Sequence, residues 1–219
     1  YKDAGSAENF GEWLDLYHNE KEKRPVCLSE YGGGGAISQH KDNVNWESDI
    51  DPVGVRHYEN YQSQLHEILW KQFSVRKYLW AEFIWCMFDF ASYGRTEGDT
   101  KSLNDKGLCT RERIPKDVYF FYRSVWSSEK TVYITERRHE FRACDVPFVK
   151  VYSNADAVEL CINDVSYGRM SRCELPDNEN TVFVWKNIKI IPDTKNKICA
   201  KAYFSDGTSR TDYAFWTGK

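Results

Sequence analysis

Two continuous apolar runs mark the first half of the chain, and each ends at a carboxylate that opens a polar loop. Residues 26–28 lead to Glu30 and then to four successive glycines, and the run over residues 81–88 ends at Asp89. Runs without polar alternation are typical of strands buried on both faces of a parallel sheet. Catalytic groups of α/β barrels lie at the C-terminal ends of such strands, so Glu30 is the first candidate for function. A structural glutamate beside a glycine hinge explains these few residues equally well.

Amphipathic segments alternate with the apolar runs. Apolar residues three and four positions apart predict helices over residues 6–20 and 57–73, and a third helix with Pro115 in its first turn. On the second of these helices, His57 and His66 are predicted to lie at the surface. Because strand, long polar loop and helix occur twice in this order, the segment is predicted to form a parallel sheet covered by helices.

The pattern changes near residue 127, where short alternating runs begin. They lie at residues 131–134, 149–152, 157–162, 181–185, 188–191 and 198–204, with Asn, Asp, Pro and Gly between them. Short strands separated by turn residues predict an antiparallel β-sandwich. The chain is therefore predicted to have two domains of different class, residues 1–127 and residues 128–219.

The seven cysteines indicate neither a disulfide framework nor a zinc site, because their number is odd and no Cys-x-x-Cys pair occurs. The order Cys161, Trp185, Cys199 would suit an immunoglobulin-type bridge across a tryptophan. Strand alternation argues against that bridge, since both cysteines fall on the face opposite their apolar neighbours. Mostly free thiols are expected.

Composition narrows the possible partners. Aromatic residues make up 16% of the 219 residues, which suits sugar stacking but also ordinary cores and interfaces. The net charge is -3 without a basic block, so no nucleic-acid partner is expected. No apolar run approaches the roughly 20 residues of a membrane span. No cofactor or metal motif is identifiable, and any export signal would lie upstream of Tyr1.

Several motifs, in order, resemble the C-terminal part of the barrel of glycoside hydrolase family 2. They are Ser-Glu-Tyr-Gly at residues 29–32 and the segments at residues 83–92, 94–99, 103–108 and 111–122. Residues 151–163 resemble the sandwich that follows this barrel. The pattern is most similar to β-galactosidase-type members from gut bacteria. The resemblance implies the C-terminal portion of a (β/α)8 TIM barrel followed by an all-β immunoglobulin-like sandwich. It also implies a periplasmic or secreted enzyme.

In that family the glutamate of Ser-Glu-Tyr-Gly is the nucleophile of a retaining exo-β-glycosidase, which implies this role for Glu30. Trp85 matches a tryptophan in the floor of the sugar site. Asn104 and Lys106 match an Asn-x-Lys element that lines the sugar subsite. In β-glucuronidases this element pairs with the uronate carboxylate, so it does not by itself select the sugar.

Three further residues are placed near the substrate by the same resemblance. Tyr31 follows the nucleophile directly and is expected to contact the substrate. Asp89 is a candidate substrate-binding residue, although Asp89 and Arg95 are expected mainly to orient their neighbours through hydrogen bonds.

The second carboxylate that retention requires, roughly 5 to 5.5 Å from the first, is not found in this chain. In the family it is a Glu after Asn at the end of the fourth barrel strand. The Asn-Glu pairs ending at Glu20 and Glu179 lie at a helix end and in a sandwich turn, and neither Glu82 nor Glu97 has the family context. The chain alone is therefore expected to be inactive. It is expected to need the preceding part of the same protein and to self-associate through exposed barrel edges.

Other functions stay open. A β-linked glycan or galactoside is the expected substrate, with β-glucuronidase or β-mannosidase specificity as the alternatives within the family. A non-catalytic carbohydrate-binding piece would instead use a row of aromatic residues on the sandwich. The candidates for that row are Tyr152, Tyr167, Trp185, Tyr203, Tyr213 and Trp216.

Overall fold

The computed structural model describes residues 7–20, 23–45, 48–49 and 54–219. These residues form two compact units. Unit 1 comprises the described residues up to Gln39 and those from Val44 to Val118, and unit 2 comprises His40–Asn43 and Tyr119–Lys219. Helix α4 (Asp117–Trp126) crosses this division. The domain boundary at residue 127 stays a prediction.

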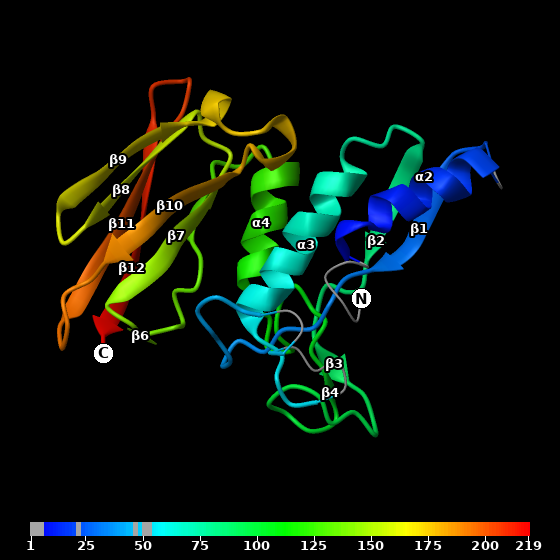
Figure 1. Ribbon diagram of the computed structural model, residues 1–219, viewed down its shortest axis with the longest axis horizontal. Coiled ribbons are helices and arrows are strands. Elements are labelled where there is room, and N and C mark those ends of the chain that lie inside the picture. The colour runs from blue at the N-terminus through cyan, green and yellow to red at the C-terminus, as the bar shows by residue number, and fades with distance from the viewer. Residues whose placement is uncertain (1–6, 21–22, 46–47, 50–53) are drawn as a thin grey trace. The chain divides into compact units, whose positions relative to one another are not determined.

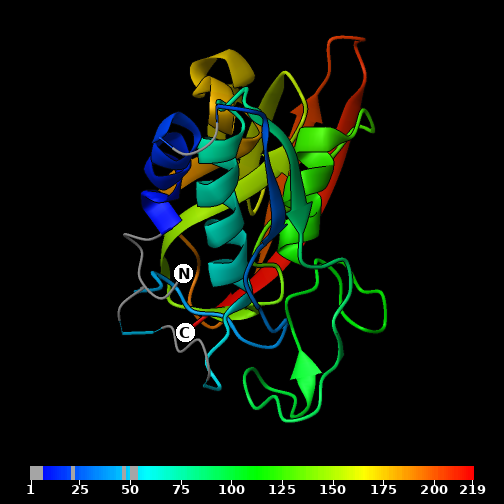
Figure 2. The same cartoon turned by 90° about the vertical axis from the view of Figure 1, so that its right-hand side faces the viewer.

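Unit 1 contains a strand–helix–strand element in which the two strands run parallel. Strand β1 (Val26–Tyr31) is followed by helix α3 (Glu59–Phe73) and strand β2 (Leu79–Ile84), and the strands lie side by side (Figures 1 and 2). The predicted helix and both strands are confirmed. β2 ends earlier than the predicted residue 88, because the Cys86 N–H bonds the carbonyl of Lys106 (3.2 Å) and not β1. Among the described residues this pair has no third strand.

Helix α2 (Phe10–Glu20) is bound to the segment that follows α3. The Arg76 guanidinium donates to both carboxylate oxygens of Asp15 at 3.1 and 2.7 Å, and the Tyr78 hydroxyl donates to the same group at 2.5 Å. The hydrogen bond from Arg76 contributes most to a lowered pKa of Asp15. This connection joins the helix before β1 to the start of β2.

The loop after β2 carries a small antiparallel hairpin. It consists of β3 (Phe90–Ala91) and β4 (Leu103–Asn104), with Phe90 opposite Asn104. Since Lys106 lies two residues after the end of β4, and its carbonyl accepts the hydrogen bond from the Cys86 N–H, the hairpin brings the Asn-x-Lys element back to the end of β2.

Unit 2 contains an all-β sandwich, as the short alternating runs predicted (Figure 1). Its strands are β5 (Val132–Ile134), β6 (Phe141–Arg142), β7 (Asp145–Ser153), β8 (Ala157–Ile162), β9 (Val165–Ser171), β10 (Val182–Lys189), β11 (Lys195–Tyr203) and β12 (Ser209–Gly218). One sheet has the order β10-β7-β5 and the other β6-β12-β11-β8-β9. Aliphatic side chains, Phe183 and Trp216 fill the core. The runs predicted at 181–185 and 188–191 form one strand, β10. Strands β6, β9 and β12 were not predicted.

Half of the six aromatic residues proposed for a carbohydrate-binding surface are not at the surface. Tyr152, Trp185 and Trp216 are buried in unit 2, so they pack the core and cannot form such a row. Tyr167 and Tyr213 are exposed. All seven cysteines are free, as expected, and Cys161 and Cys199 are directly opposed on neighbouring strands β8 and β11.

Helices of membrane-spanning length and apolarity do not occur in the described part of the chain.

Candidate active site

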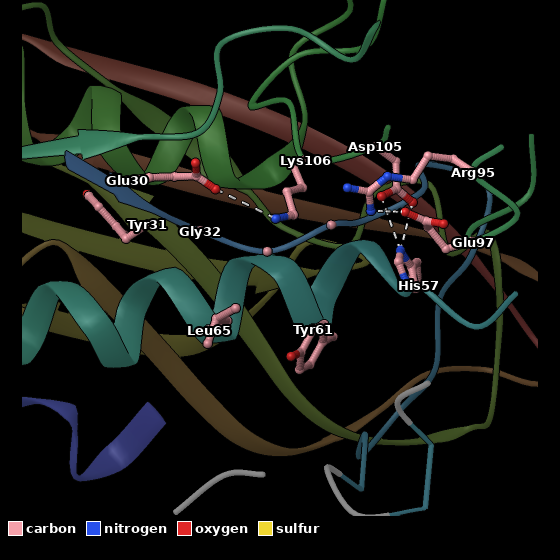
Figure 3. Close-up of a pocket in the computed structure, with 12 residues that line it drawn as sticks. Glu30, Tyr31, Gly32, His57, Tyr61, Leu65, Arg95, Glu97, Asp105 and Lys106 are labelled. Carbon is pink, nitrogen blue, oxygen red and sulfur yellow. Dashed lines mark hydrogen bonds and ion pairs between the residues drawn. The ribbon is translucent and has the colours of Figure 1, made fainter. Parts of the chain in front are cut away.

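A cavity of about 400 Å³ lies beside the C-terminal end of β1 in unit 1. Figure 3 shows the side chains around it, with Tyr61 and Leu65 projecting from α3. The lining residues are Glu30, Tyr31, Gly32, Gly33, Gly34, His57, Tyr61, Leu65, Arg95, Glu97, Asp105 and Lys106. The polar lining residues form two regions. The first is the pair of Glu30 and Lys106, and the second is a cluster of His57, Arg95, Glu97 and Asp105.

The first region places a carboxylate opposite an ammonium. Glu30 is the second-last residue of strand β1. Its side chain is 53% exposed, and its Oε1 is 3.9 Å from Nζ of Lys106 (Figure 3). A carboxylate that is accessible and faces a positive charge at a strand end is suited to act as a nucleophile on a bound substrate. Two of the predicted site residues, Glu30 and Lys106, are therefore brought together.

Asn104 shapes the turn that presents Lys106. Its side chain is buried, and its Oδ1 accepts a hydrogen bond from the backbone N–H of Lys106 at 3.1 Å. Asn104 does not line the cavity, so its contribution here is to hold the neighbouring lysine.

Tyr31 and Trp85 lie at the same end of the parallel pair. Tyr31 is buried against Phe73, with ring centroids 5.1 Å apart, and its carbonyl accepts a hydrogen bond from the Trp85 N–H at 2.8 Å. Trp85 is 44% exposed, stands edge-on to Phe90, and is joined to Cys86 by a cis peptide bond. Trp85 does not line the cavity that contains Glu30.

Asp89 points into the protein and not into the cavity. Its Oδ1 accepts hydrogen bonds from Nζ of Lys116 and from the Gly107 N–H, both at 2.8 Å. Burial raises the pKa of Asp89, although the Lys116 ammonium opposes that rise. A Cβ at residue 107 would lie 2.2 Å from the Asp89 nitrogen, so only glycine permits this approach. The geometry fits the orienting role expected for Asp89.

The second region of the cavity is centred on Asp105, which sequence reasoning did not single out. Its carboxylate is buried, and both oxygens lie within 3.1 Å of Nδ1 of His57. A Cβ at Gly34 would lie 2.2 Å from Asp105 Oδ1, so the glycine lets the loop pass close to the carboxylate. The prediction that His57 lies on the surface is wrong, because its hydrogen bonds with Asp105 hold the ring in the interior. The position of Asp105 within the Asn-x-Lys element was the available signal.

His66 is also buried, again contrary to the prediction of a surface position. It lies on α3 beneath the end of β1, with its ring 5.8 Å from that of Tyr31. Burial lowers the pKa of His66 to about 3, with a smaller contribution from the charge of Lys116. The ring is thus a neutral part of the floor beneath Tyr31.

Neither remaining acidic candidate resembles a proton donor to a leaving group. Glu97 lines the cavity and is paired with Arg95, as Figure 3 shows. Burial would raise the pKa of Glu97, but hydrogen bonds from Arg95 and from backbone N–H groups outweigh burial and lower it. Burial raises the pKa of Glu82, which lies on β2 outside the cavity lining. Among the described residues, Glu30 is the one carboxylate that faces Lys106 across the cavity.

Comparisons with known proteins show that the chain is similar to part of several glycosidases. A protein-family model described as a domain of unknown function, DUF4982, matches residues 146–210. A β-glucuronidase from Bacteroides fragilis is 36% identical over 180 residues, which are 81% of this chain and 25% of that protein. A crystal structure described as an FMN-binding β-glucuronidase from Faecalibacterium prausnitzii L2-6 matches with a TM-score of 0.82 and 32% identity. That match covers 97% of this chain and 30% of the other. The chain is a homologue of glycoside hydrolase family 2 enzymes.

The family 2 homology also extends to a β-galactosidase. A Bacteroides ovatus β-galactosidase is 23% identical over 153 residues, which are 66% of this chain and 18% of that protein. The expected resemblance to this family of glycoside hydrolases is confirmed. The chain spans only part of the length of these two curated relatives, 25% of the first and 18% of the second.

Proposed function

We propose that this chain supplies the nucleophile of a retaining β-glycosidase, and that Glu30 is this nucleophile. The observation that carries the proposal is the accessible Glu30 carboxylate at the end of β1, 3.9 Å from the Lys106 ammonium at the edge of a cavity. A rigid strand end is a suitable place for such a group, because attack requires a fixed distance to the anomeric carbon.

The proposed step is a displacement at the anomeric carbon. A Glu30 oxygen forms a bond to C1 of the sugar while the bond from C1 to the leaving oxygen breaks, and that oxygen takes a proton from a second carboxylic acid. Water then cleaves the glycosyl–Glu30 ester with that second group acting as base. We assign the acid/base to the part of the enzyme that precedes this chain, so the chain alone is expected to be inactive.

We propose a β-glucuronide as the substrate. An ammonium such as that of Lys106 pairs with a uronate carboxylate through a charge-assisted hydrogen bond. The Arg95 guanidinium adds a second positive group to the cavity lining. Support also comes from the relatives described as β-glucuronidases. A β-galactoside is the second candidate, because a β-galactosidase is also among the relatives.

Unit 1 is then proposed to be the C-terminal portion of a (β/α)8 barrel, and unit 2 an immunoglobulin-like sandwich. In support, β1, α3 and β2 form a parallel crossover whose strands pair only with each other in the described chain. Trp85 is proposed to form part of the sugar-site floor, with Tyr31 and Asn104 supporting Glu30 and Lys106. Asp89 is proposed to act through its neighbours.

The test uses the complete enzyme with an aryl β-glucuronide and an aryl β-galactoside. Replacing Glu30 with Gln is expected to lower kcat by roughly a thousandfold or more. With Glu30→Ala, added azide is expected to enter from the vacated face and give the α-glycosyl azide, which product analysis identifies. The exposed residue Glu112 provides a control, since Glu112→Gln is expected to retain wild-type kcat.

Retention of activity by Glu30→Gln would overturn the assignment of the nucleophile. The use of two substrates tests the proposed sugar separately from the proposed nucleophile. Wild-type enzyme that hydrolyses only the galactoside would contradict the β-glucuronide as substrate and leave Glu30 as the nucleophile.

A further inference from the structure

Lys116 is a buried lysine that the proposed chemistry does not use. Its side chain has no exposed surface. Its ammonium donates three hydrogen bonds, to the carbonyls of Gly35 (2.7 Å) and Asp105 (2.8 Å) and to Oδ1 of Asp89 (2.8 Å). A lysine ammonium has three donors, so every one of them is used.

The three acceptors come from three separate stretches of unit 1, two of which include residues that line the cavity. Gly35 belongs to the glycine loop that follows Glu30, Asp105 directly precedes Lys106, and Asp89 lies in the loop after β2. Lys116 thus joins the loop of the proposed nucleophile to the turn that carries the facing ammonium. Glu30 is separated by only a few residues from Gly35, and Lys106 directly follows Asp105. The carbonyls of Gly35 and Asp105 both accept hydrogen bonds from the Lys116 ammonium.

Asp89 extends this connection to the other side of the turn. The oxygen that binds Lys116 also accepts a hydrogen bond from the Gly107 N–H. Lys106 is therefore flanked by two fixed main-chain positions, its neighbours Asp105 and Gly107. The backbone that carries its side chain has little freedom to shift toward or away from Glu30.

Gln62 makes a parallel connection from helix α3. Its amide nitrogen donates to the carbonyls of Gly33 (2.8 Å) and Gly107 (3.2 Å). The glycine loop and the Asn-x-Lys turn are thus held together at two separate points. Lys116 and Gln62 are both buried, and each donates hydrogen bonds to main-chain carbonyls of both segments. These bonds fix the distance between the glycine loop and the Asn-x-Lys turn.

A purely stabilising ion pair would explain less of this geometry. A buried lysine and carboxylate are on their own weak evidence for stability, because desolvation offsets their attraction. Here two of the three hydrogen bonds of Lys116 go to carbonyls in the cavity walls, beyond what charge pairing with Asp89 requires.

We propose that Lys116 is a positioning residue that sets the separation of the Glu30 carboxylate and the Lys106 ammonium. This inference rests on the proposed function of Glu30 as nucleophile. Lys116 does not touch the substrate in this role, and acts through the main chain on either side of the cavity.

The test measures trapping of the glycosyl-enzyme in the complete enzyme. A fluorinated aryl glycoside that forms the intermediate but releases it slowly gives one burst of phenol per competent site, so the burst size counts sites and the burst rate reports their geometry. Lys116→Met is expected to slow the burst per titrated site by roughly 10- to 100-fold. Lys101→Met, an exposed lysine of the same unit, is expected to leave it unchanged.

Because Lys116→Met leaves the buried Asp89 without its cation, the double variant Lys116→Met/Asp89→Asn is measured alongside it. The double variant removes the unpaired charge, and it is expected to recover the number of titrated sites but not the burst rate.

The outcomes separate this inference from the proposed function. Wild-type enzyme that gives no burst on either sugar would reject the proposed function itself. A wild-type burst together with a wild-type rate per site in either variant would reject only the positioning role. If neither variant yields any titratable site, Lys116 is a residue of the folded core, which also contradicts the proposal.

Discussion

At the residue scale, buried polar side chains hold the loops around the cavity in place through hydrogen bonds. Lys116, Gln62 and Asp89 are buried and bond main-chain groups of the surrounding loops. Glu30 and Lys106 stand at the exposed side of this arrangement. A rigid support of this kind keeps reactive groups in place before substrate binds, which is the physical basis of preorganisation.

The buried ring of His66 makes acid stability a test of this support. Burial lowers its pKa to about 3, against about 6.5 in an unfolded chain. Between these values the unfolded state binds a proton that the folded state does not bind. The contribution is therefore fully present above pH 6.5 and is lost as pH falls toward 3, at up to about 1.4 kcal/mol per pH unit.

We expect the unfolding free energy of this chain to fall more steeply between pH 6.5 and about pH 4 than that of His66→Asn. Urea unfolding followed by tryptophan fluorescence at several pH values measures both slopes. The comparison uses slopes, so a uniform loss of stability in the variant does not affect it. Equal slopes would show that folding does not lower the pKa of His66.

At the element scale, β8 and β11 hold the only cysteine pair that is opposed in strand register in the described residues. Cys161 and Cys199 face each other and are half-buried on the side away from the core. Directly opposed residues of antiparallel strands have Cα atoms about 4.5 to 5.5 Å apart, and a disulfide spans this distance. The two strands are therefore already placed for a cross-strand bond.

Incubation with a small-molecule disulfide is expected to join these cysteines. One thiolate displaces a small thiol to form a mixed disulfide, and the second cysteine displaces another, so one molecule of oxidant yields two small thiols. Burial, and then the neighbouring Cys161, raise the pKa of Cys199, so the reaction should accelerate as pH rises. Peptide mapping under non-reducing conditions identifies the bond. The disulfide is expected to raise the free energy of unfolding by on the order of 2 kcal/mol.

Cys161→Ser is the matched control and should give no linked peptide. If mapping of the wild type finds only mixed disulfides at Cys161 or Cys199, the side chains do not approach each other as the strand register implies.

The sequence predicted those elements in which apolar residues are either continuous or regularly spaced. The strand ending at Glu30 and the helix before β2 were found in this way. Strand β12 was missed because Tyr213 and Phe215 face outward while Ala214 and Trp216 face the core, which removes the alternation.

Strand β9 was missed for a different reason. It lies at the edge of its sheet and is mostly exposed, so its sequence carries no buried face. Polar edge strands of this kind resemble loops when only the pattern of apolar residues is available.

Within the candidate site, the sequence and its family resemblance indicated Glu30, Asn104, Lys106 and Asp89, but not the supporting contacts of Lys116 and Gln62. The pairing of His57 with Asp105, and of Lys116 with Gly35, joins positions far apart in the chain. Local periodicity contains no information on such contacts, so both histidines were predicted at the surface.

At the scale of the whole molecule, each strand of the parallel pair in unit 1 has an edge without a partner in the described chain. Apolar side chains accompany these edges, since Trp80 is 66% exposed and Phe83 55% exposed. Unpaired strand edges beside exposed apolar groups favour association with another chain.

Sedimentation velocity at increasing concentration is expected to show self-association of this chain. The substitutions Trp80→Thr and Phe83→Thr together are expected to shift the distribution toward monomer, since they remove exposed apolar surface while keeping residues that favour strands. Val165→Thr, an exposed substitution in unit 2, is the control and should not change it. A wild-type monomer at every concentration would contradict this expectation.

The bonding of Lys116 has a consequence for how such a site can change its substrate. Two of its three acceptors are peptide carbonyls, which every amino acid provides, so these two hydrogen bonds do not depend on the side chains of the residues that accept them. Loop residues other than the closely packed glycines can therefore be exchanged, and with them the preferred sugar, while the main chain keeps its course. A single frame of this kind is compatible with both galactoside and glucuronide specificities among homologous enzymes.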